Sequence, residues 1–210
     1  MTKSRNSTMV IIILIAVILI LGIFLFRAQR QENPPLNLTD TSNESCTSFN
    51  AGFKILSLNY TNSEGELKEK TVAILYPTDE AEQEYEYLMI KGSNARDAKI
   101  SPCAKFPLIM FSHGYTGCGI QSVFLTEDFA RNGYIVIAPD HDDALCSTMP
   151  GKGSSLEEFD LSQFNNPQDW SDATYLDRKE DIEFLLDYAL AENSKQDSFF
   201  FSSIDKDSVG

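Results

Sequence analysis

Positive charge is scarce in this sequence. Seventeen lysines and arginines face 31 aspartates and glutamates, so the formal net charge of the 210 residues is −14. A surface of this sign repels phosphate backbones and anionic lipid headgroups. The composition therefore argues against a nucleic-acid partner and against a polybasic protein that binds membrane surfaces.

Signatures of nucleotide and metal chemistry are also missing. The sequence holds neither G-x-G-x-x-G nor G-x-x-x-x-G-K-[ST], the spacings that arrange backbone amides around phosphates. The acidic cluster Asp140, Asp142 and Asp143 offers ligands to a hard cation, but with only two histidines it does not favour a catalytic metal. We expect neither a cofactor nor a metal. A hydrophobic content of 42% supports a packed core rather than disorder.

One long apolar run is present near the start of the chain. Met9–Phe26 contains no charged or polar side chain, and as a helix it would span roughly 27 Å, close to the thickness of a bilayer core. The alternative is a cleavable signal peptide, whose apolar region is usually shorter and precedes a small-x-small site. No such site follows here, which favours a transmembrane signal anchor.

Cysteines and glycosylation signals indicate which side of a membrane the rest would occupy. All four cysteines follow the apolar run, as do three of the four Asn-x-Ser/Thr sites, at Asn37, Asn43 and Asn59. This distribution is compatible with disulfides in an oxidising compartment, although free thiols and chance sites remain the alternative. We expect a single-pass protein whose folded part is extracytoplasmic, whether lumenal, extracellular or periplasmic.

The expected organisation has four parts. Residues 1–8 form a tail, 9–26 the membrane anchor, 27–51 a polar stalk rich in Ser, Thr and Asn, and 52–210 the folded domain. Polar stretches with paired prolines are typical of such stalks.

Strand and helix patterns alternate within the folded part. Phe53–Tyr60 and Glu69–Tyr76 predict a β-hairpin, while residues 78–102 read as polar and irregular, with a weak helical tendency near 79–89. Further patterns predict buried strands at 106–112 and 134–138, and helices at 121–132 and 176–193. Such alternation is typical of an α/β fold with a mostly parallel sheet. Residues 199–210 read as a turn into one more strand, which stops early; we therefore expect a fragment of a longer chain.

Two polar segments follow the predicted parallel strands. His113–Gly119 follows the first and Asp140–Asp143 the second, and ligands of such sheets bind beyond the carboxyl ends of the strands. The glycine-containing turn at the start of a helix would suit an anion or a developing oxyanion. An ordinary tight strand-to-helix turn is the alternative.

Four motifs in the same order resemble the α/β-hydrolases. FPLIMFSHGYTGCGIQSVFLTEDFARNGYIVIAPDH is similar to their strand, His-Gly loop, helix and strand. YLDRKEDIEFLLD resembles the Arg-x-x-Asp-Ile helix that precedes the nucleophile, and IDKDSVG resembles the entry to the nucleophile strand. In detail the resemblance is to platelet-activating-factor acetylhydrolases and dienelactone-hydrolase-like esterases, over about 107–210.

This resemblance implies a serine carboxylic-ester hydrolase of the lipase-like kind, acting on small-molecule or lipid esters and hence in lipid metabolism. In such enzymes a Ser attacks the ester, a His takes its proton, an Asp orients the His, and backbone N–H groups hold the oxyanion. One of these donors maps onto the N–H of Tyr115 in the loop that includes His113 and Gly114. The same resemblance implies structural roles for His113 and His141.

The sequence departs from the family pattern at the nucleophile. No G-x-S-x-G occurs, so we expect the Ser, the acid and the His of the triad to lie beyond Gly210 and the 210-residue piece to be inactive. The rival hypothesis is a truncated or degenerate hydrolase fold that serves as a binding ectodomain without catalysis.

Two further expectations depend on this fold. Cys118 and Cys146 would follow neighbouring strands and are the first choice for a disulfide, although four cysteines allow three connectivities. The long connection 142–174 carries Phe159, Phe164 and Trp170. It would form a lid or acyl-chain wall, or else a surface excursion.

Overall fold

The computed structural model describes residues 46, 48–88, 90–149 and 167–210, with the backbone alone for 167–174. The chain divides into two units, Met1–Ser42 and Asn43–Gly210, and the first lies wholly outside the described residues. The expected tail, the anchor at 9–26 and the sites at Asn37 and Asn43 all precede residue 46 and lie outside the described residues too. Within the described part, no helix is both long and apolar enough to cross a membrane.

The folded unit begins with a long antiparallel hairpin. β1 (Asn50–Thr61) pairs along its full length with β2 (Leu67–Thr78). The Asn62 side chain accepts backbone hydrogen bonds from Glu64 and Glu66, and Gly65 takes a φ of +85°, a conformation that glycine adopts at little cost. The hairpin is predicted correctly, but β1 starts at Asn50, inside the segment expected to be stalk.

A second hairpin occupies part of the segment expected to be irregular or helical. β3 (Gln83–Tyr87) pairs antiparallel with β4 (Ile90–Arg96). Tyr85 and Tyr87 alternate with glutamates and pack against Phe53 of β1, with ring centroids 5.5 and 5.0 Å apart. The helical expectation is wrong because aromatic packing on a neighbouring strand outweighs the weak local preference of a Glu-rich sequence.

The remaining strands and two helices alternate along the chain. Their order is β5 (Phe106–Met110), α2 (Val123–Arg131), β6 (Ile135–Pro139), α3 (Pro167–Glu192) and β7 (Ile204–Val209). The seven-stranded sheet has the order β3-β4-β1-β2-β6-β5-β7. Parallel pairing joins β5 to β6, β5 to β7 and β1 to β4, whereas the other three pairings are antiparallel. The described sheet is therefore mixed, not mostly parallel as expected.

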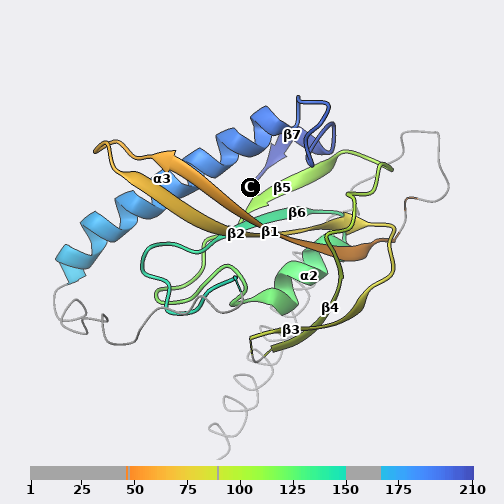
Figure 1. The fold of residues 1–210 in the computed structure, drawn as a ribbon, viewed down its shortest axis with the longest axis horizontal. Coiled ribbons are helices and arrows are strands. Elements are labelled where there is room, and N and C mark those ends of the chain that lie inside the picture. Colours follow the sequence, from red (N-terminus) through yellow and green to blue (C-terminus); the bar gives the residue numbers. More distant parts are fainter. Residues whose placement is uncertain (1–45, 47, 89, 150–166) are drawn as a thin grey trace, which may run out of the picture. The chain divides into compact units, whose positions relative to one another are not determined.

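Each face of the sheet is covered by one described helix (Figure 1). Leu185 and Ala189 of α3 join a buried cluster with Ile74 and Ile137, while Val123 of α2 joins a second cluster on the other face. Successive residues of a strand point to opposite faces, so β2 and β6 supply both clusters from alternate positions. This arrangement explains why β6 is buried along its whole length.

Candidate functional site

The candidate site lies where β5 and β6 end. These strands are parallel, so the segments that follow them, 111–119 and 140–149, emerge at the same edge of the sheet. This is the edge at which ligands bind in α/β folds. The structure thus brings together the two polar segments that the sequence analysis singles out.

The loop after β5 has an unusual backbone. Thr116 has a φ of +63°, a left-handed conformation that is rare for a β-branched residue and costs on the order of 1–3 kcal/mol. The Thr116 N–H donates to a carboxylate oxygen of Asp143 at 3.1 Å, and the Thr116 carbonyl accepts from the Leu145 N–H at 3.1 Å. The segment after β6 therefore holds this strained turn from both sides.

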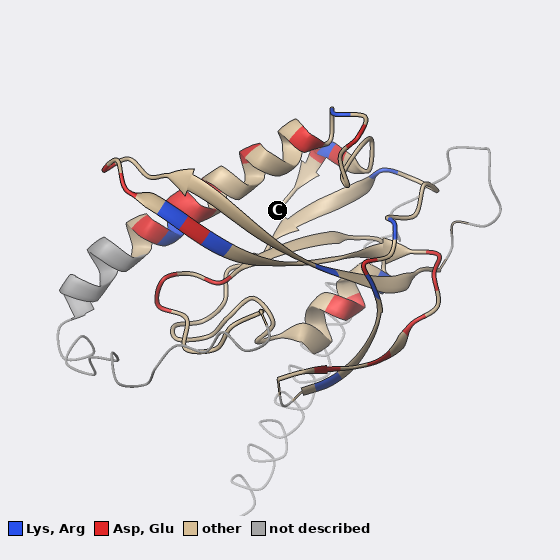
Figure 2. Cartoon of the chain, viewed as in Figure 1, with Lys and Arg blue, Asp and Glu red and all other residues tan. Residues whose placement is uncertain are grey.

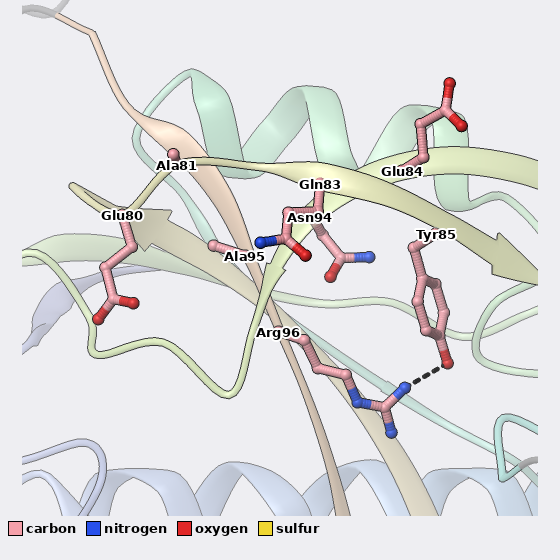
Figure 3. Close-up of a pocket in the computed structure, with 8 residues that line it drawn as sticks. All are labelled: Glu80, Ala81, Gln83, Glu84, Tyr85, Asn94, Ala95 and Arg96. Atoms are coloured by element: carbon pink, nitrogen blue, oxygen red, sulfur yellow. Dashed lines mark hydrogen bonds between the residues drawn. The ribbon is translucent and has the colours of Figure 1, made fainter.

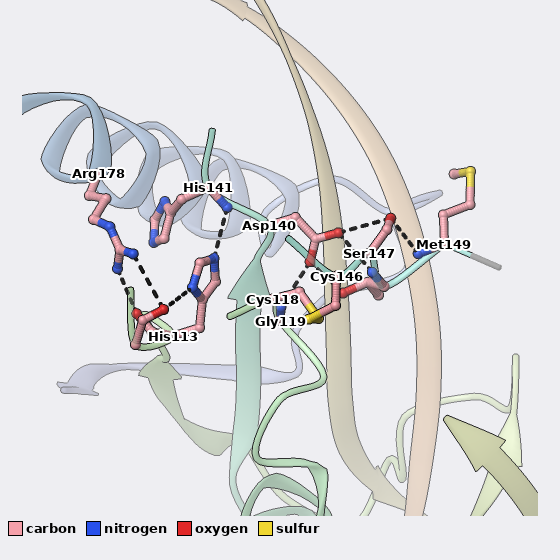
Figure 4. Close-up of a disulfide and its surroundings, with 11 residues drawn as sticks. His113, Cys118, Gly119, Asp140, His141, Cys146, Ser147, Met149 and Arg178 are labelled. Carbon is pink, nitrogen blue, oxygen red and sulfur yellow. Dashed lines mark hydrogen bonds between the residues drawn. A yellow bond between two sulfur atoms is a disulfide. The ribbon is translucent and has the colours of Figure 1, made fainter. Parts of the chain in front are cut away.

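The side chain of Arg178, on α3, holds the same loop through hydrogen bonds. Its guanidinium donates to the carbonyl oxygen of His113 at 2.6 Å (Figure 4). It also donates to the carboxylate of Asp143 at 2.7 Å and approaches the Gly114 carbonyl at 3.5 Å. The planar fork of five donors suits Arg for several acceptors at once. One side chain thus joins α3 to both loops.

His113 has a structural environment. Its Nδ1 lies 2.7 Å from the Gly114 carbonyl oxygen, and its Nε2 accepts the backbone N–H of His141 at 3.0 Å (Figure 4). These two bonds require a neutral ring protonated on Nδ1. Burial is the main cause that lowers the pKa of His113, which favours the same neutral form. Both nitrogens are therefore committed to holding the loops together.

His141 lies between a hydroxyl and a carboxylate. Its Nε2 is 3.0 Å from Ser112 Oγ, and its Nδ1 is 2.7 Å from Oδ2 of Asp181. The ring is 3% exposed, whereas Ser112 is exposed. Ser112 and Asp181 lie within segments that resemble the hydrolases, but neither is predicted from the sequence to contact His141, because Asp181 lies 40 residues along the chain from His141 and only the packing of α3 brings them together.

Asp181 also belongs to a group of charges that joins β2 to α3. Figure 2 shows basic and acidic positions, in blue and red, along both elements. Lys70 lies 3.0 Å from Asp181 and also pairs with Asp142, and the Lys70 and Asp181 side chains are each 1% exposed. Tyr60 donates its hydroxyl to Asp181 at 2.6 Å. Burial and this carboxylate together raise the pKa of Tyr60, so Tyr60 is a neutral hydrogen-bond donor.

The acidic cluster after β6 is divided among different partners. Asp140 accepts from the Gly119 N–H, the Thr148 N–H and the Thr148 hydroxyl at 2.6–2.8 Å. Asp142 pairs with lysines and Asp143 with Arg178. Among the described residues no group of three or more His, Cys, Asp or Glu side chains could hold a metal ion. Through these hydrogen bonds and ion pairs the three carboxylates hold the loop after β6 against neighbouring segments.

Gly119 makes the contact of the first loop with β6 possible. A Cβ at this position would lie 2.2 Å from the carbonyl oxygen of Ala138, and a backbone atom of a buried strand cannot move away easily. The neighbouring Cys118 forms a disulfide with Cys146, with Cα atoms 5.4 Å apart (Figure 4). This is the pair that the sequence analysis names first.

A second disulfide joins Cys46 to Cys103, with Cα atoms 5.8 Å apart. It ties residue 46, within the expected stalk, to the connection between β4 and β5.

The other predicted site residues have the following places. Tyr115 lies partly buried in the loop between His113 and Thr116, and Asn59 has an exposed side chain on β1. Of the predicted lid, residues 150–166, including Phe159 and Phe164, lie outside the described part, as does the side chain of Trp170.

A separate cavity of about 240 Å³ opens at the β3–β4 hairpin (Figure 3). Glu80, Glu84 and Asn94 line it, and Arg96 donates to the hydroxyl of Tyr85 at 2.6 Å. No histidine or cysteine lines this cavity. Both histidines of the sequence lie instead in the loops that follow β5 and β6.

Comparisons with a solved structure and with a family model identify proteins that this chain resembles. The structure resembles a ferulic acid esterase from Streptomyces cinnamoneus, with a TM-score of 0.57 and 20% sequence identity. The likeness covers 81% of this chain and 53% of the esterase chain, so this chain spans about half of that structure. At this identity the likeness shows a shared α/β-hydrolase fold.

The sequence itself matches one family model. Residues 80–183 match the family described as platelet-activating factor acetylhydrolase, isoform II. No curated protein sequence matches the chain significantly. The family match and the shared fold support a relationship to α/β-hydrolase-type esterases, which confirms the resemblance drawn from the four motifs.

Because Arg178 holds the loop after β5 and the carboxylate of Asp143, we expect the substitution Arg178→Met to destabilise the folded domain. This change would leave Asp143 without its charged partner in a mostly buried place, and we expect the free energy of unfolding to fall by about 2–3 kcal/mol. Urea unfolding measures this, and amide exchange at Thr116 should become faster.

Lys179→Met provides the matched control, because Lys179 follows Arg178 on α3 and makes an exposed pair with Glu183. Such pairs contribute little. An unfolding curve for Arg178→Met that overlays the control would contradict the role assigned to Arg178.

Asp143 predicts an acid dependence of stability. Burial acts to raise its pKa, but hydrogen bonds from Arg178 and the Thr116 N–H outweigh burial and lower it overall. A pKa lower in the folded than in the unfolded state means that the contribution is complete above the unfolded value of about 3.9 and is lost as pH falls through the folded value. The urea midpoint should therefore fall between about pH 5 and pH 2.

In Asp143→Asn the position no longer titrates, so this fall should be shallower than in the unsubstituted chain. Asp187→Asn, which changes an exposed carboxylate on α3, should keep the original slope. Equal slopes for all three proteins would show that Asp143 does not contribute to acid stability.

Proposed function

We propose that this chain is the N-terminal part of a serine carboxylic-ester hydrolase that is anchored to a membrane. The observation that carries the proposal is the loop 113–119, held in a strained shape at the carboxyl end of β5 by contacts from Asp143, Leu145 and Arg178. Fixed backbone donors aimed at developing charge are the largest contribution to ester hydrolysis in many enzymes. The family match and the shared fold support the same function.

In this proposal the N–H of Tyr115 is one donor to the oxyanion. The strained Thr116 and the turn closed by the Gly117 N–H on the Gly114 carbonyl, at 2.9 Å, set the direction of the peptide groups between them. Arg178 and Asp143 act as positioning residues, since their contacts fix the loop without taking part in the reaction.

The triad nucleophile is proposed to follow Gly210. Gly210 is hydrogen-bonded to β5 through the Met110 N–H and the Leu108 carbonyl, at 2.8 and 2.9 Å. Residues that continue from β7 would therefore leave the sheet beside the loop after β5. A Gly-x-Ser-x-Gly turn placed there would face the proposed oxyanion donor.

The proposed substrates are amphiphilic esters, such as short-chain or phospholipid esters. The apolar run at 9–26 supports a membrane anchor, and an anchor would hold the enzyme beside esters that partition into lipid. Two disulfides within the described residues support an extracytoplasmic place for the domain, because such bonds persist in oxidising compartments.

A second candidate is a binding ectodomain that has lost catalysis. The observation that favours it is the lack of a Gly-x-Ser-x-Gly sequence anywhere in the 210 residues. The coding sequence downstream of Gly210 separates the two: a Gly-x-Ser-x-Gly followed by Asp and His favours the enzyme, and an immediate stop codon favours the binding domain.

The protein extended past Gly210 is expected to hydrolyse short-chain p-nitrophenyl esters and phospholipid acyl esters. Replacement of the Ser of its Gly-x-Ser-x-Gly by Ala should abolish turnover, because the attacking oxygen is removed. An extended, folded protein without any ester hydrolysis would overturn the proposed function.

Tyr115→Pro in the extended protein tests the oxyanion donor. Proline lacks the backbone N–H, so turnover should fall by about 10²–10³-fold if that N–H holds the oxyanion. Tyr115→Ala keeps the N–H and serves as the matched control, which should retain most of the turnover. Equal losses in both variants would assign the effect to the side chain instead.

A further inference from the structure

The contacts of Ser112, His141 and Asp181 form a second constellation that the proposed mechanism does not use. Ser112 Oγ lies 3.0 Å from Nε2 of His141, and Nδ1 of the same ring lies 2.7 Å from Oδ2 of Asp181. These are the distances expected between a nucleophile, its general base and the group that orients the base. From this geometry we propose that Ser112 is itself a reactive nucleophile in this chain, activated by His141.

The hydrogen-bond pattern determines where the protons are. The Asp181 carboxylate can only accept, so Nδ1 of His141 carries the proton of that bond and Nε2 is left as an acceptor. The Ser112 hydroxyl then donates to Nε2, which is the direction that a base requires. Arg178 donates to the same Ser112 oxygen at 3.2 Å, and a cation at this place stabilises negative charge as it develops.

The three residues of the constellation differ in their exposure to solvent. Ser112 is exposed, whereas His141 is 3% and Asp181 1% exposed. A small substrate or a water molecule can therefore approach His141 only from the side of Ser112, while Asp181 stays buried behind it. Burial strengthens the hydrogen bond between His141 and Asp181.

Asp181 has ion-pair and hydrogen-bond partners other than His141. Lys70 lies 3.0 Å from the same Oδ2, and Tyr60 donates to Oδ1 at 2.6 Å. These partners share the negative charge that would otherwise stabilise a protonated imidazole. The activity expected of Ser112 is therefore modest, and the constellation is best detected with a reactive acylating or phosphonylating reagent.

The reaction with an activated ester balances as follows. Ser112 Oγ forms a bond to the acyl carbon while the bond from that carbon to the leaving oxygen breaks, and His141 carries the hydroxyl proton to the leaving group. Water then attacks the acyl-Ser112 with His141 as base, which releases the carboxylic acid and restores the hydroxyl. The substrate class is small activated esters, because no walled acyl pocket is needed at an exposed hydroxyl.

The test uses the 210-residue chain with a fluorophosphonate reagent and maps the modified residue by mass spectrometry. Label is expected on Ser112 in the folded chain and should disappear when the chain is unfolded in urea, because unfolding separates Ser112 from His141. Ser57 is the internal control: it is also exposed, but its hydroxyl donates to the carboxylate of Glu69 and no imidazole activates it.

Variants assign the roles. Ser112→Ala should remove the label, whereas Ser57→Ala should leave it unchanged. His141→Asn should slow the labelling by about 100-fold or more, and Asp181→Asn by about tenfold or more. Circular dichroism checks that each variant is folded, and the comparison of Ser112 with Ser57 in the unsubstituted chain decides the question even if a buried variant does not fold.

Labelling of Ser112 no faster than of Ser57, or unchanged labelling in a folded His141→Asn, would overturn the proposal and leave the constellation as a brace between loops. This outcome is separable from the proposed function, which concerns a Ser beyond Gly210 and is tested on the extended protein. An extended protein that hydrolyses esters while Ser112 stays unlabelled would refute the Ser112 proposal alone.

Discussion

The site depends on two charged side chains of α3, Arg178 and Asp181, which lie three residues apart and so project from the same side of the helix. Arg178 holds the loop after β5 and the carboxylate of Asp143, whereas Asp181 contacts Lys70 of β2 and His141. Charges buried in this way are tolerated only when each has a close partner, because desolvation costs several kcal/mol per ion. A one-residue change in the register of α3 would separate Arg178 from Asp143 and Asp181 from Lys70 and His141, so the register of the helix and the shape of the loops are fixed together.

The strained turn at Thr116 depends on contacts from the loop after β6, which Arg178 in turn holds in place. A left-handed threonine is unfavourable by itself, and it persists because the surroundings over-determine it: Asp143 holds its N–H, Leu145 holds its carbonyl, and the disulfide between Cys118 and Cys146 closes the loop two residues later. None of these contacts is local in the sequence. The loop after β5 therefore takes its shape from the loop after β6 and from α3 as well as from its own glycines.

This dependence also explains what the sequence could and could not predict. Apolar runs and turn residues predicted the first hairpin, β5, β6 and both described helices, because those signals are local and periodic. β3 and β4 were missed, because Tyr85 and Tyr87 become strand residues only against Phe53. The segments that resemble hydrolases contain Ser112 and, as the Asp of the Arg-x-x-Asp-Ile helix, Asp181, but the resemblance did not predict that both residues contact His141, since each lies far from it in the chain. Pairings of charged groups across tens of residues require the packed helix.

The partners of the hydroxyls in this region differ in a way that bears on chemistry. The Thr148 hydroxyl donates to the carboxylate of Asp140 and that of Ser57 to Glu69, and a carboxylate is a weaker base than an imidazole for taking a hydroxyl proton. Ser112 donates instead to an imidazole, the side chain that most often serves as a general base. The same charges that fix the loops also set the tautomer of His141, because Asp181 takes the Nδ1 proton and leaves Nε2 facing Ser112. Bracing two loops and activating a hydroxyl therefore require the same three side chains, Ser112, His141 and Asp181. The two roles differ in whether the hydroxyl is accessible to a substrate, and Ser112 is an exposed residue.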